Sequence, residues 1–275
     1  MPLPSLWSHL ETVQRLLQPP SALALFTDID GTISPIVPVP EEGAVTPRCR
    51  AALERLASRL PLVGAVSGRA AAHARAMVGL DGLIYLGNHG LERWPRSVLS
   101  PPSSATPEAL ADLAARLAGL PGLRLEDKGP VVGVHYRLAP DPEQAREQAL
   151  SAAHAVAARY GLRVAEGRRV VELRPAVEVN KGTALRALLD EHPDVRAVLY
   201  LGDDRTDADA FRALHRWAAD QEGRVAVALA VLSPETPPEV QEHADYALEG
   251  VGAVERFLEW LARVCQIQAE AEQPR

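Results

Sequence analysis

Short runs of apolar residues alternate along this chain with longer segments whose apolar residues recur at helical spacing. The short runs are rich in leucine and β-branched residues and predict buried strands at 22–26, 61–66, 83–86, 197–201 and 225–230. The longer segments predict helices at 47–60, 70–78, 181–192 and 207–219. This order predicts an α/β fold with a parallel sheet and helices on both faces. Ligands bind at the carboxyl ends of the strands in such sheets, so polar residues there are candidates for function.

The middle of the chain breaks this alternation. Residues 95–107 are rich in proline and serine and predict a linker. The pattern after the linker predicts, in order, helix 107–118, strands 122–128 and 131–138, helix 142–160, and strands 162–165 and 169–174. Strands that pair without crossover helices indicate a small α+β unit. We therefore expect a core domain of residues 1–104 and 177–275, with an α+β domain inserted at 105–176.

No segment has the pattern of a membrane span. A span needs about 20 apolar residues, and the longest apolar run, 225–232, has eight and suits a buried strand. Residues 1–18 predict an amphipathic surface helix rather than a signal peptide, and 254–268 predict another amphipathic helix. Cys49 and Cys265 have no metal-ligand spacing around them; a disulfide is conceivable, but a reduced cytoplasmic protein is the simpler interpretation.

The charge of the chain limits the classes of partner. A net charge of −7 without a basic stripe argues against nucleic acid. It also repels a phosphate ester, so a site for one must reverse the potential locally. Of the 29 basic residues only two are lysines, Lys128 and Lys181. Either two lysines survived by chance, or they stand where a compact, rotatable charge is needed.

The strongest motif is Asp28-Ile29-Asp30-Gly31-Thr32, directly after the strand at 22–26. Residues i and i+2 of an extended segment point the same way, so both carboxylates project into the loops at the strand end. One carboxylate can attack phosphorus while the other transfers the leaving-group proton, and Thr32 offers a hydroxyl and an N–H to phosphate oxygens. The alternatives are an Asx turn or part of a calcium loop, but Gly31 comes too early for the calcium pattern.

Three more polar clusters follow strands or open helices. Ser67-Gly68-Arg69 follows the strand at 61–66 and suits either an anion cradle at a helix start or a plain N-cap. Lys181, in Asn180-Lys181-Gly182-Thr183, opens a helix and is able to screen the repulsion between a phosphate and its nucleophile. The carboxylates of Gly202-Asp203-Asp204-Arg205-Thr206-Asp207 suit magnesium, helix capping, or both.

These clusters together require a cation. Five aspartates near one site repel one another and a phosphate dianion, whereas bound magnesium with Lys181 and Arg69 inverts that field. Competing motifs are absent, since the sequence has no nucleotide-binding Gly-x-x-x-x-Gly-Lys-Ser/Thr loop and no Gly-x-Gly-x-x-Gly. Nor does Ser67 lie in a Gly-x-Ser-x-Gly hydrolase elbow. The sequence therefore predicts a magnesium-dependent phosphatase.

In order along the chain, these motifs resemble those of haloacid-dehalogenase-type phosphatases, and within them the trehalose-6-phosphate phosphatases. Supporting stretches are Gly87–Gly90, Glu126–Lys128, His135–Arg137, Glu172–Pro175 and Asn180–Gly182. The similarity runs from about Leu25 to Phe211. The resemblance implies a Rossmann-like core with an inserted α+β cap domain for sugar recognition. Arg168 stands where the family often has lysine, and Ala208 replaces a common glutamate.

The resemblance also implies a role for each matching position. Asp28 would be the nucleophile that forms an aspartyl-phosphate, and Asp30 the general acid and then base. Magnesium would be held by the Asp28 side chain, the Asp30 carbonyl and Asp203, with support from Asp204 and Asp207. The phosphoryl group would be held by Thr32, Ser67, Gly68, Arg69 and Lys181. The substrate, including its sugar, would meet Asn88, His89, Glu126, Lys128, Arg137, Arg168 and Glu172.

We thus expect a chain that hydrolyses trehalose 6-phosphate, with a small sugar phosphate as its only partner and a monomeric state. One alternative is a phosphatase for another sugar phosphate, such as sucrose phosphate or a glycosylated phosphoglycerate. A phosphomutase would use the same aspartyl-phosphate and differ in its product. The last alternative is a sensor that binds a sugar phosphate without turnover, although a sensor would be free to lose Asp28 or Asp30.

Overall fold

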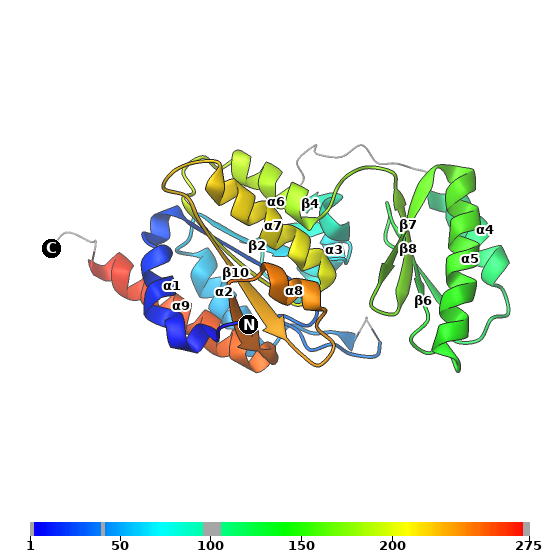
Figure 1. Cartoon of the computed structure of the whole chain (residues 1–275), viewed down its shortest axis with the longest axis horizontal. Coiled ribbons are helices and arrows are strands. Elements are labelled where there is room, and N and C mark those ends of the chain that lie inside the picture. Colours follow the sequence, from blue (N-terminus) through cyan, green and yellow to red (C-terminus); the bar gives the residue numbers. More distant parts are fainter. Residues whose placement is uncertain (1–2, 40–41, 96–105, 272–275) are drawn as a thin grey trace. The chain divides into compact units, whose positions relative to one another are not determined.

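The computed structural model describes residues 3–39, 42–95 and 106–271. The chain divides into two compact units, one formed by Met1–Ser97 with Val179–Arg275 and the other by Val98–Glu178 (Figure 1). The second unit contains the insertion predicted at 105–176. The predicted linker at 95–107 lies outside the described residues except at its two ends.

The first unit is built on a seven-stranded sheet in the order β11-β10-β9-β1-β2-β3-β4. Every neighbouring pair is parallel except β3 with β4. The strands are β1 (Leu23–Thr27), β2 (Leu62–Val66), β3 (Ile84–Gly87), β4 (Glu92–Trp94), β9 (Ala197–Gly202), β10 (Val225–Leu232) and β11 (Tyr246–Glu249). The five strands predicted for this unit are confirmed. Since β1 lies between β9 and β2, the loops that follow these three strands are neighbours.

Residues of the central strands alternate between two apolar clusters, one on each face of the sheet. In β1, Leu23 and Leu25 belong to one cluster, and Ala24 and Phe26 belong to the other. All five residues of β1 are buried, so neither face of the strand meets water. This is why the sequence shows a continuous apolar run there instead of an apolar–polar alternation.

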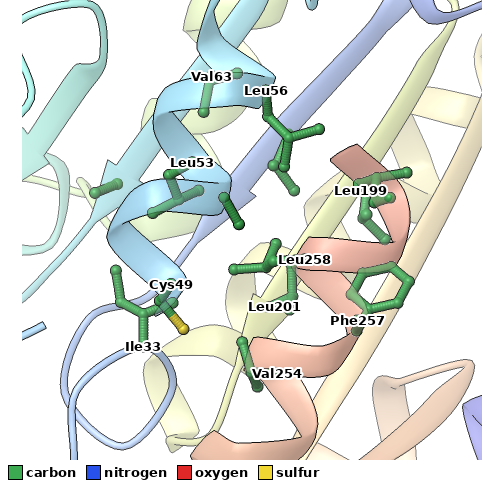
Figure 2. Close-up of a cluster of buried hydrophobic side chains, with 14 of the residues drawn as sticks. Ile33, Cys49, Leu53, Leu56, Val63, Leu199, Leu201, Val254, Phe257 and Leu258 are labelled. Carbon is green, nitrogen blue, oxygen red and sulfur yellow. The ribbon is translucent and has the colours of Figure 1, made fainter. Parts of the chain in front are cut away.

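Helices cover both faces, as the sequence predicted. The first cluster includes residues of α2 (Pro47–Ala57), α3 (Ala71–Val78) and α9 (Gly250–Ala271), and the second includes residues of α6 (Lys181–Asp190) and α7 (Arg205–Ala219). Figure 2 shows part of the first cluster, to which Leu53 of α2, Phe257 of α9 and Leu199 of β9 all contribute. The fold is therefore the predicted α/β arrangement.

Shorter elements complete this unit. The helix predicted at 1–18 is a 3-10 turn, Leu6–His9, followed by α1 (Leu10–Leu16), and a second 3-10 turn, Pro20–Ala22, leads into β1. The six-residue α8 (Pro238–His243) precedes β11. Among the residues that the structure describes, no helix has the length and apolar character needed to cross a membrane.

The second unit is a four-stranded antiparallel sheet in the order β5-β6-β8-β7 with two helices on one face. Its elements are α4 (Thr106–Leu117), β5 (Arg124–Asp127), β6 (Val132–His135), α5 (Pro142–Tyr160), β7 (Leu162–Gly167) and β8 (Val170–Pro175). The apolar cluster under the helices takes Val132 and Val134 from β6 and Leu173 from β8. Because side chains alternate along a strand, Gly133 and Glu172 point to the opposite face.

Candidate active site

Asp28 follows the last residue of β1 and is almost fully buried, at 4% exposure. Its backbone N–H donates to the Leu201 carbonyl of β9 at 2.8 Å, which extends the strand pairing past the end of β1. The carboxylate Oδ1 accepts a hydrogen bond from Lys181 Nζ at 2.6 Å. The backbone of two central strands therefore fixes this carboxylate at the edge of the sheet.

Lys181 is the first residue of α6 and is 2% exposed. The helix start is fixed by a capping box, in which the Asn180 side chain accepts from the Thr183 N–H and the Thr183 hydroxyl contacts the Asn180 backbone. From this position Nζ donates to Asp28 Oδ1 at 2.6 Å and to Asp207 Oδ1 at 2.7 Å. One lysine thus bridges the carboxylates that follow two different strands.

Asp207 is fully buried and accepts four hydrogen bonds. Its Oδ1 accepts from Lys181 Nζ and from the Tyr200 hydroxyl, both at 2.7 Å. Its Oδ2 accepts from the backbone N–H groups of Asp203 at 3.1 Å and Asp204 at 3.0 Å. A carboxylate offers about four lone-pair sites, so those of Asp207 are in use. This residue holds the loop after β9 in place.

Three carboxylates form a group suited to a metal ion. Single oxygens of Asp28, Asp203 and Asp207 lie within 4.8 Å of one another, and all three residues are buried. Since Asp207 already accepts four hydrogen bonds, Asp28 and Asp203 are the side chains that fit as direct ligands. Buried carboxylate oxygens are the ligands that a hard cation such as Mg²⁺ prefers.

Gly31 lets the chain pass close to Asp203. Its φ is +89°, and a Cβ at this position would lie 2.2 Å from Asp203 Oδ2. The neighbouring Thr32, predicted to bind phosphate, is fully buried and donates from its hydroxyl to Asp203 Oδ1 at 3.3 Å. The glycine and the threonine of the motif therefore position Asp203 beside the end of β1.

Asp30 is paired with Arg69. The guanidinium donates from Nε to Asp30 Oδ2 and from Nη2 to Asp30 Oδ1, both at 2.7 Å. The Arg69 side chain is 12% exposed and that of Asp30 is 37% exposed. The sequence had suggested Arg69 as a phosphate ligand, and the structure places it on the second carboxylate of the motif.

The start of α3 explains the position of Arg69. Ser67 follows β2 and is buried, and its hydroxyl accepts from the Arg69 N–H at 3.1 Å; it is not the N-cap of α3, which is Ala70. The first N–H of the helix, at Ala71, donates to Glu92 of β4 at 2.8 Å. A Cβ on Gly87 would lie 2.1 Å from that Ala71 nitrogen, so the helix start rests directly on β3.

Asn88 and His89 follow β3 with positive φ angles of 49° and 57°. Asparagine and histidine are among the few residues enriched in this left-handed region. Their backbone N–H groups donate to the Arg69 carbonyl at 2.7 Å and the Ser67 carbonyl at 3.0 Å. A Cβ on Gly68 would lie 2.7 Å from His89 Nε2, so the two predicted loops are packed against each other.

The electrostatic balance of the site is negative. Burial raises the pKa of the Asp28 carboxyl well above its usual range, Lys181 opposes this, and Asp207 and Asp203 add to it. Burial alone would lower the pKa of Lys181, but Asp207 and Asp28 outweigh it and raise that pKa. Burial also raises the pKa of the Tyr200 hydroxyl, which stays protonated and donates. A cation bound beside Asp28 would oppose the effect of burial and favour the ionised carboxylate.

Asp204 adjoins this group, and the other remaining predicted residues belong to the second unit. Asp204 is the N-cap of α7. In the second unit, Lys128 Nζ donates to Glu172 Oε1 at 2.9 Å and lies 3.6 Å from Glu126 Oε2. Arg137 and Arg168 lie at the opposite end of β6 and β8 from Lys128, where Arg137 Nη2 donates to the Arg168 carbonyl at 3.5 Å. The structure therefore brings Glu126, Lys128 and Glu172 together and places the two arginines elsewhere on the sheet.

Four supporting residues received no role from the sequence. They are Tyr200, which holds Asp207; Glu92, which caps α3; and His135 and Arg174, which contact the carboxylates of Glu126 and Glu172. For His135 and Arg174 a signal was present, because each lies two residues along a strand from Gly133 or Glu172 and so faces the same side. Tyr200 and Glu92 carried no such signal, since each acts on a residue of another element.

The fold is shared with haloacid-dehalogenase-like hydrolases. One such hydrolase, from Bacteroides thetaiotaomicron, has a TM-score of 0.60 at 15% identity, over 87% of this chain and 98% of that one. The family model described as trehalose-phosphatase matches residues 26–250, and the chain belongs to this family.

Individual relatives are consistent with the family. The chain is 38% identical over 205 residues to the trehalose-phosphate phosphatase of Mycobacterium marinum, covering 70% of this chain and 51% of that protein. It therefore spans about half the length of this curated relative. The C-terminal domain of the C. albicans trehalose-6-phosphate phosphatase superposes with a TM-score of 0.77 at 23% identity, covering 95% of this chain and 98% of that domain.

Proposed function

We propose that this chain hydrolyses trehalose 6-phosphate to trehalose and inorganic phosphate through a covalent aspartyl-phosphate on Asp28, with bound Mg²⁺. The observation that carries the proposal is the bridge of Lys181 between Asp28 and Asp207, beside Asp203. A buried ammonium touching a nucleophile is placed to screen its repulsion from a phosphate. The family and the relatives named above support the sugar phosphate as substrate.

Asp28 is the proposed nucleophile. In the first step a carboxylate oxygen of Asp28 bonds to phosphorus, the bond from phosphorus to the sugar oxygen breaks, and Asp30 gives its proton to that oxygen. In the second step Asp30 takes a proton from a water molecule whose oxygen attacks phosphorus. The bond from phosphorus to Asp28 then breaks, and phosphate leaves. Asp30 is then protonated again, and Asp28 is again a free carboxylate.

Asp30 acts as a proton donor only when one of its oxygens is free to carry the proton. Both oxygens accept hydrogen bonds from Arg69. The proposed chemistry therefore requires the pair to open at least on one side when the substrate binds. Arg69 keeps the carboxylate oriented until then.

Asp28 and Asp203 are the proposed side-chain ligands of Mg²⁺, with Asp207 and Thr32 fixing the position of Asp203. When bound, the ion supplies positive charge that attracts the phosphate dianion and stabilises charge in the transition state. This is how a chain of net charge −7 holds an anionic substrate. Ser67 and Lys181 are the proposed phosphoryl-binding residues.

The second unit is the proposed sugar-recognition domain. Glu126, Lys128 and Glu172 gather on the face of its sheet that the helices leave uncovered, above Gly133, which has no side chain. Lys128 is 9% exposed and Glu172 4% exposed at the side chain. Ammonium and carboxylate groups held in this way offer both donors and acceptors to sugar hydroxyls.

A cytoplasmic location is also proposed. The free cysteines Cys49 and Cys265 are both buried, and burial raises the pKa of each thiol to about 11. Unreactive thiols of this kind are typical of proteins from a reducing compartment.

The test is phosphate release from a panel of sugar phosphates, with and without added Mg²⁺. The panel contains trehalose 6-phosphate, sucrose 6-phosphate, glucose 6-phosphate and glucosyl phosphoglycerate. We expect trehalose 6-phosphate to have the highest kcat/KM, and Asp28→Asn to abolish turnover without changing the melting temperature by more than a few degrees. A different best substrate would refute the sugar assignment, and a fully active Asp28→Asn variant would refute the nucleophile.

A further inference from the structure

The second unit contains a continuous chain of five charged or polar side chains on the face of its sheet opposite the two helices. Its order is His135, Glu126, Lys128, Glu172 and Arg174. His135 Nε2 lies 2.7 Å from Glu126 Oε2, and Lys128 Nζ lies 3.6 Å from that same oxygen. On the other side, Lys128 Nζ donates to Glu172 Oε1, while Arg174 Nε donates to Glu172 Oε2 at 2.9 Å.

The strand register explains why these groups meet. Glu126 of β5 lies opposite Gly133 of β6, and Gly133 lies opposite Glu172 of β8. The two glutamates therefore flank a position without a side chain. His135 and Arg174 each lie two residues farther along β6 and β8, on the same face. His135 contacts Glu126, and Arg174 contacts Glu172, each from the side away from Lys128.

His135 and Arg174 restrict the orientation of the Glu126 and Glu172 carboxylates. Glu172 has one oxygen on Lys128 and the other on Arg174, whose Nη2 contacts it as well, so its carboxylate cannot rotate without breaking a charge-assisted contact. On Glu126 a single oxygen, Oε2, contacts His135 Nε2 and faces Lys128 Nζ, so His135 fixes the oxygen that faces the lysine. Without His135 and Arg174, each glutamate would lose the contact that fixes its carboxylate from the side away from Lys128.

We propose that His135 and Arg174 are positioning residues for substrate specificity, because they hold Glu126 and Glu172 at either side of Lys128 in the arrangement that the sugar binds. This rests on the proposed function of the second unit. The residues do not act on phosphorus. Their loss should therefore affect recognition of the sugar and leave the chemistry of the first unit unchanged.

The experiment compares two substrates in the full chain: trehalose 6-phosphate, and p-nitrophenyl phosphate, which has no sugar. The variants are His135→Leu and Arg174→Met, which remove the outer contacts at similar volume. We expect kcat/KM for trehalose 6-phosphate to fall on the order of tenfold or more, since displaced groups cost that much when they position a substrate. For p-nitrophenyl phosphate we expect the kcat/KM of each variant to stay within about twofold of the wild-type value.

Conservative variants separate positioning from stability. His135→Gln keeps an N–H donor for Glu126 and should recover most of the selectivity, whereas Arg174→Lys keeps the charge without the planar fork and should be intermediate. Arg146→Met is the matched control, because it removes an arginine–glutamate pair with Glu166 from the same unit. This control should leave the ratio between the two substrates unchanged.

The outcomes of the proposed function and of the positioning role are distinct. A wild-type chain that shows no preference for trehalose 6-phosphate within the sugar panel refutes the proposed function. The positioning role is refuted if the wild type is selective but His135→Leu and Arg174→Met keep its ratio of kcat/KM between trehalose 6-phosphate and p-nitrophenyl phosphate. It is also refuted if both variants lose activity on the two substrates in parallel with a fall in melting temperature. If Arg174→Met fails to fold, unchanged ratios in His135→Leu and Arg174→Lys give the same refutation.

Discussion

Arg69 binds Asp30 through two parallel hydrogen bonds, each 2.7 Å long. The pair joins residues that follow two neighbouring strands, β1 and β2. A bidentate contact of this kind fixes the plane of the carboxylate as well as its distance from the guanidinium. The second aspartate of the motif is therefore held in orientation by a residue that the sequence suggested for another role.

The first prediction concerns this pair. Arg69→Met should lower kcat/KM by about 10- to 100-fold, because Asp30 loses its fixed orientation at the reacting centre. Arg69→Lys keeps the charge but not the fork, so its loss should be smaller. Steady-state kinetics with the best sugar phosphate measure both. Arg75→Met, which removes the pair between this residue of α3 and the exposed Asp81, should be near wild type. Full activity in Arg69→Met would contradict an orienting role.

The second prediction concerns Asp207. One oxygen of Asp207 accepts from Lys181 and Tyr200, and the other accepts from two backbone N–H groups. In Asp207→Asn an amide nitrogen replaces one of these two oxygens. Two donors would then face each other in a buried site. We expect a loss of about 3 kcal/mol or more in the free energy of unfolding, measured by urea denaturation.

The matched control for Asp207 is Asp209→Asn. Asp209 lies two residues along the same helix and pairs with Arg212 at the surface. A surface pair contributes about 0–1 kcal/mol, so this variant should be close to wild type. Equal stability of the two variants would show that the buried network does not hold the loop after β9.

Much of the fold follows from the sequence. The strands of the core, such as β1 and β9, are continuous apolar runs, and α5 begins at Pro142 and ends at Tyr160, the bounds that the pattern predicted. β4 was missed because Glu92–Trp94 has only three residues and no apolar run. β11 and α8 are similarly short. Elements of this length form through tertiary contacts, since they carry too few residues for a periodic signal.

The sequence predicted which strand ends carry the candidate site residues, but it did not predict which of these residues contact one another. Asp28, Lys181 and Asp203 follow from motif position, because parallel strands end at the same edge. That Arg69 turns to Asp30 depends on the start of α3, where Glu92 caps the helix from the unpredicted β4. Such a contact joins residues from separate elements, and no spacing along the chain encodes it.

The third prediction concerns metal removal. A chelator should abolish phosphate release, and Mg²⁺ should restore it, since the buried carboxylates of Asp28 and Asp203 need a cation. Binding to the folded state also stabilises it, so Mg²⁺ should raise the melting temperature of the wild type. Asp203→Asn should lose that rise, while Asp209→Asn should keep it. Undiminished activity in the chelated enzyme, or an equal rise in Asp203→Asn, would rule out this metal site.

The last prediction is a pH dependence of stability that is independent of the active site. His215 of α7 contacts Asp245, just before β11, with its Nε2 3.0 Å from Oδ2, and the same oxygen accepts from the Ala228 N–H of β10. The hydrogen bond to Asp245 raises the pKa of His215 above its ordinary value, against the opposing effect of burial. The folded protein thus binds the His215 proton more tightly than the unfolded chain does. The stabilisation is fully present below the unfolded pKa, about 6.5, and is lost as pH rises through the higher folded pKa.

His215→Gln tests this sign, because glutamine keeps a neutral N–H donor for Asp245 and removes only the titrating charge. The difference in melting temperature between wild type and His215→Gln should therefore be larger at pH 5.5 than at pH 8.5, measured without metal in both cases. His73→Gln, at an exposed position of α3 outside this contact, is the control for the histidine-to-glutamine substitution itself. Because the pair is more than a third exposed, solvent screens it and the difference should be modest. A difference that stays constant between the two pH values, or grows toward pH 8.5, would mean that the charged His215–Asp245 contact does not stabilise the fold.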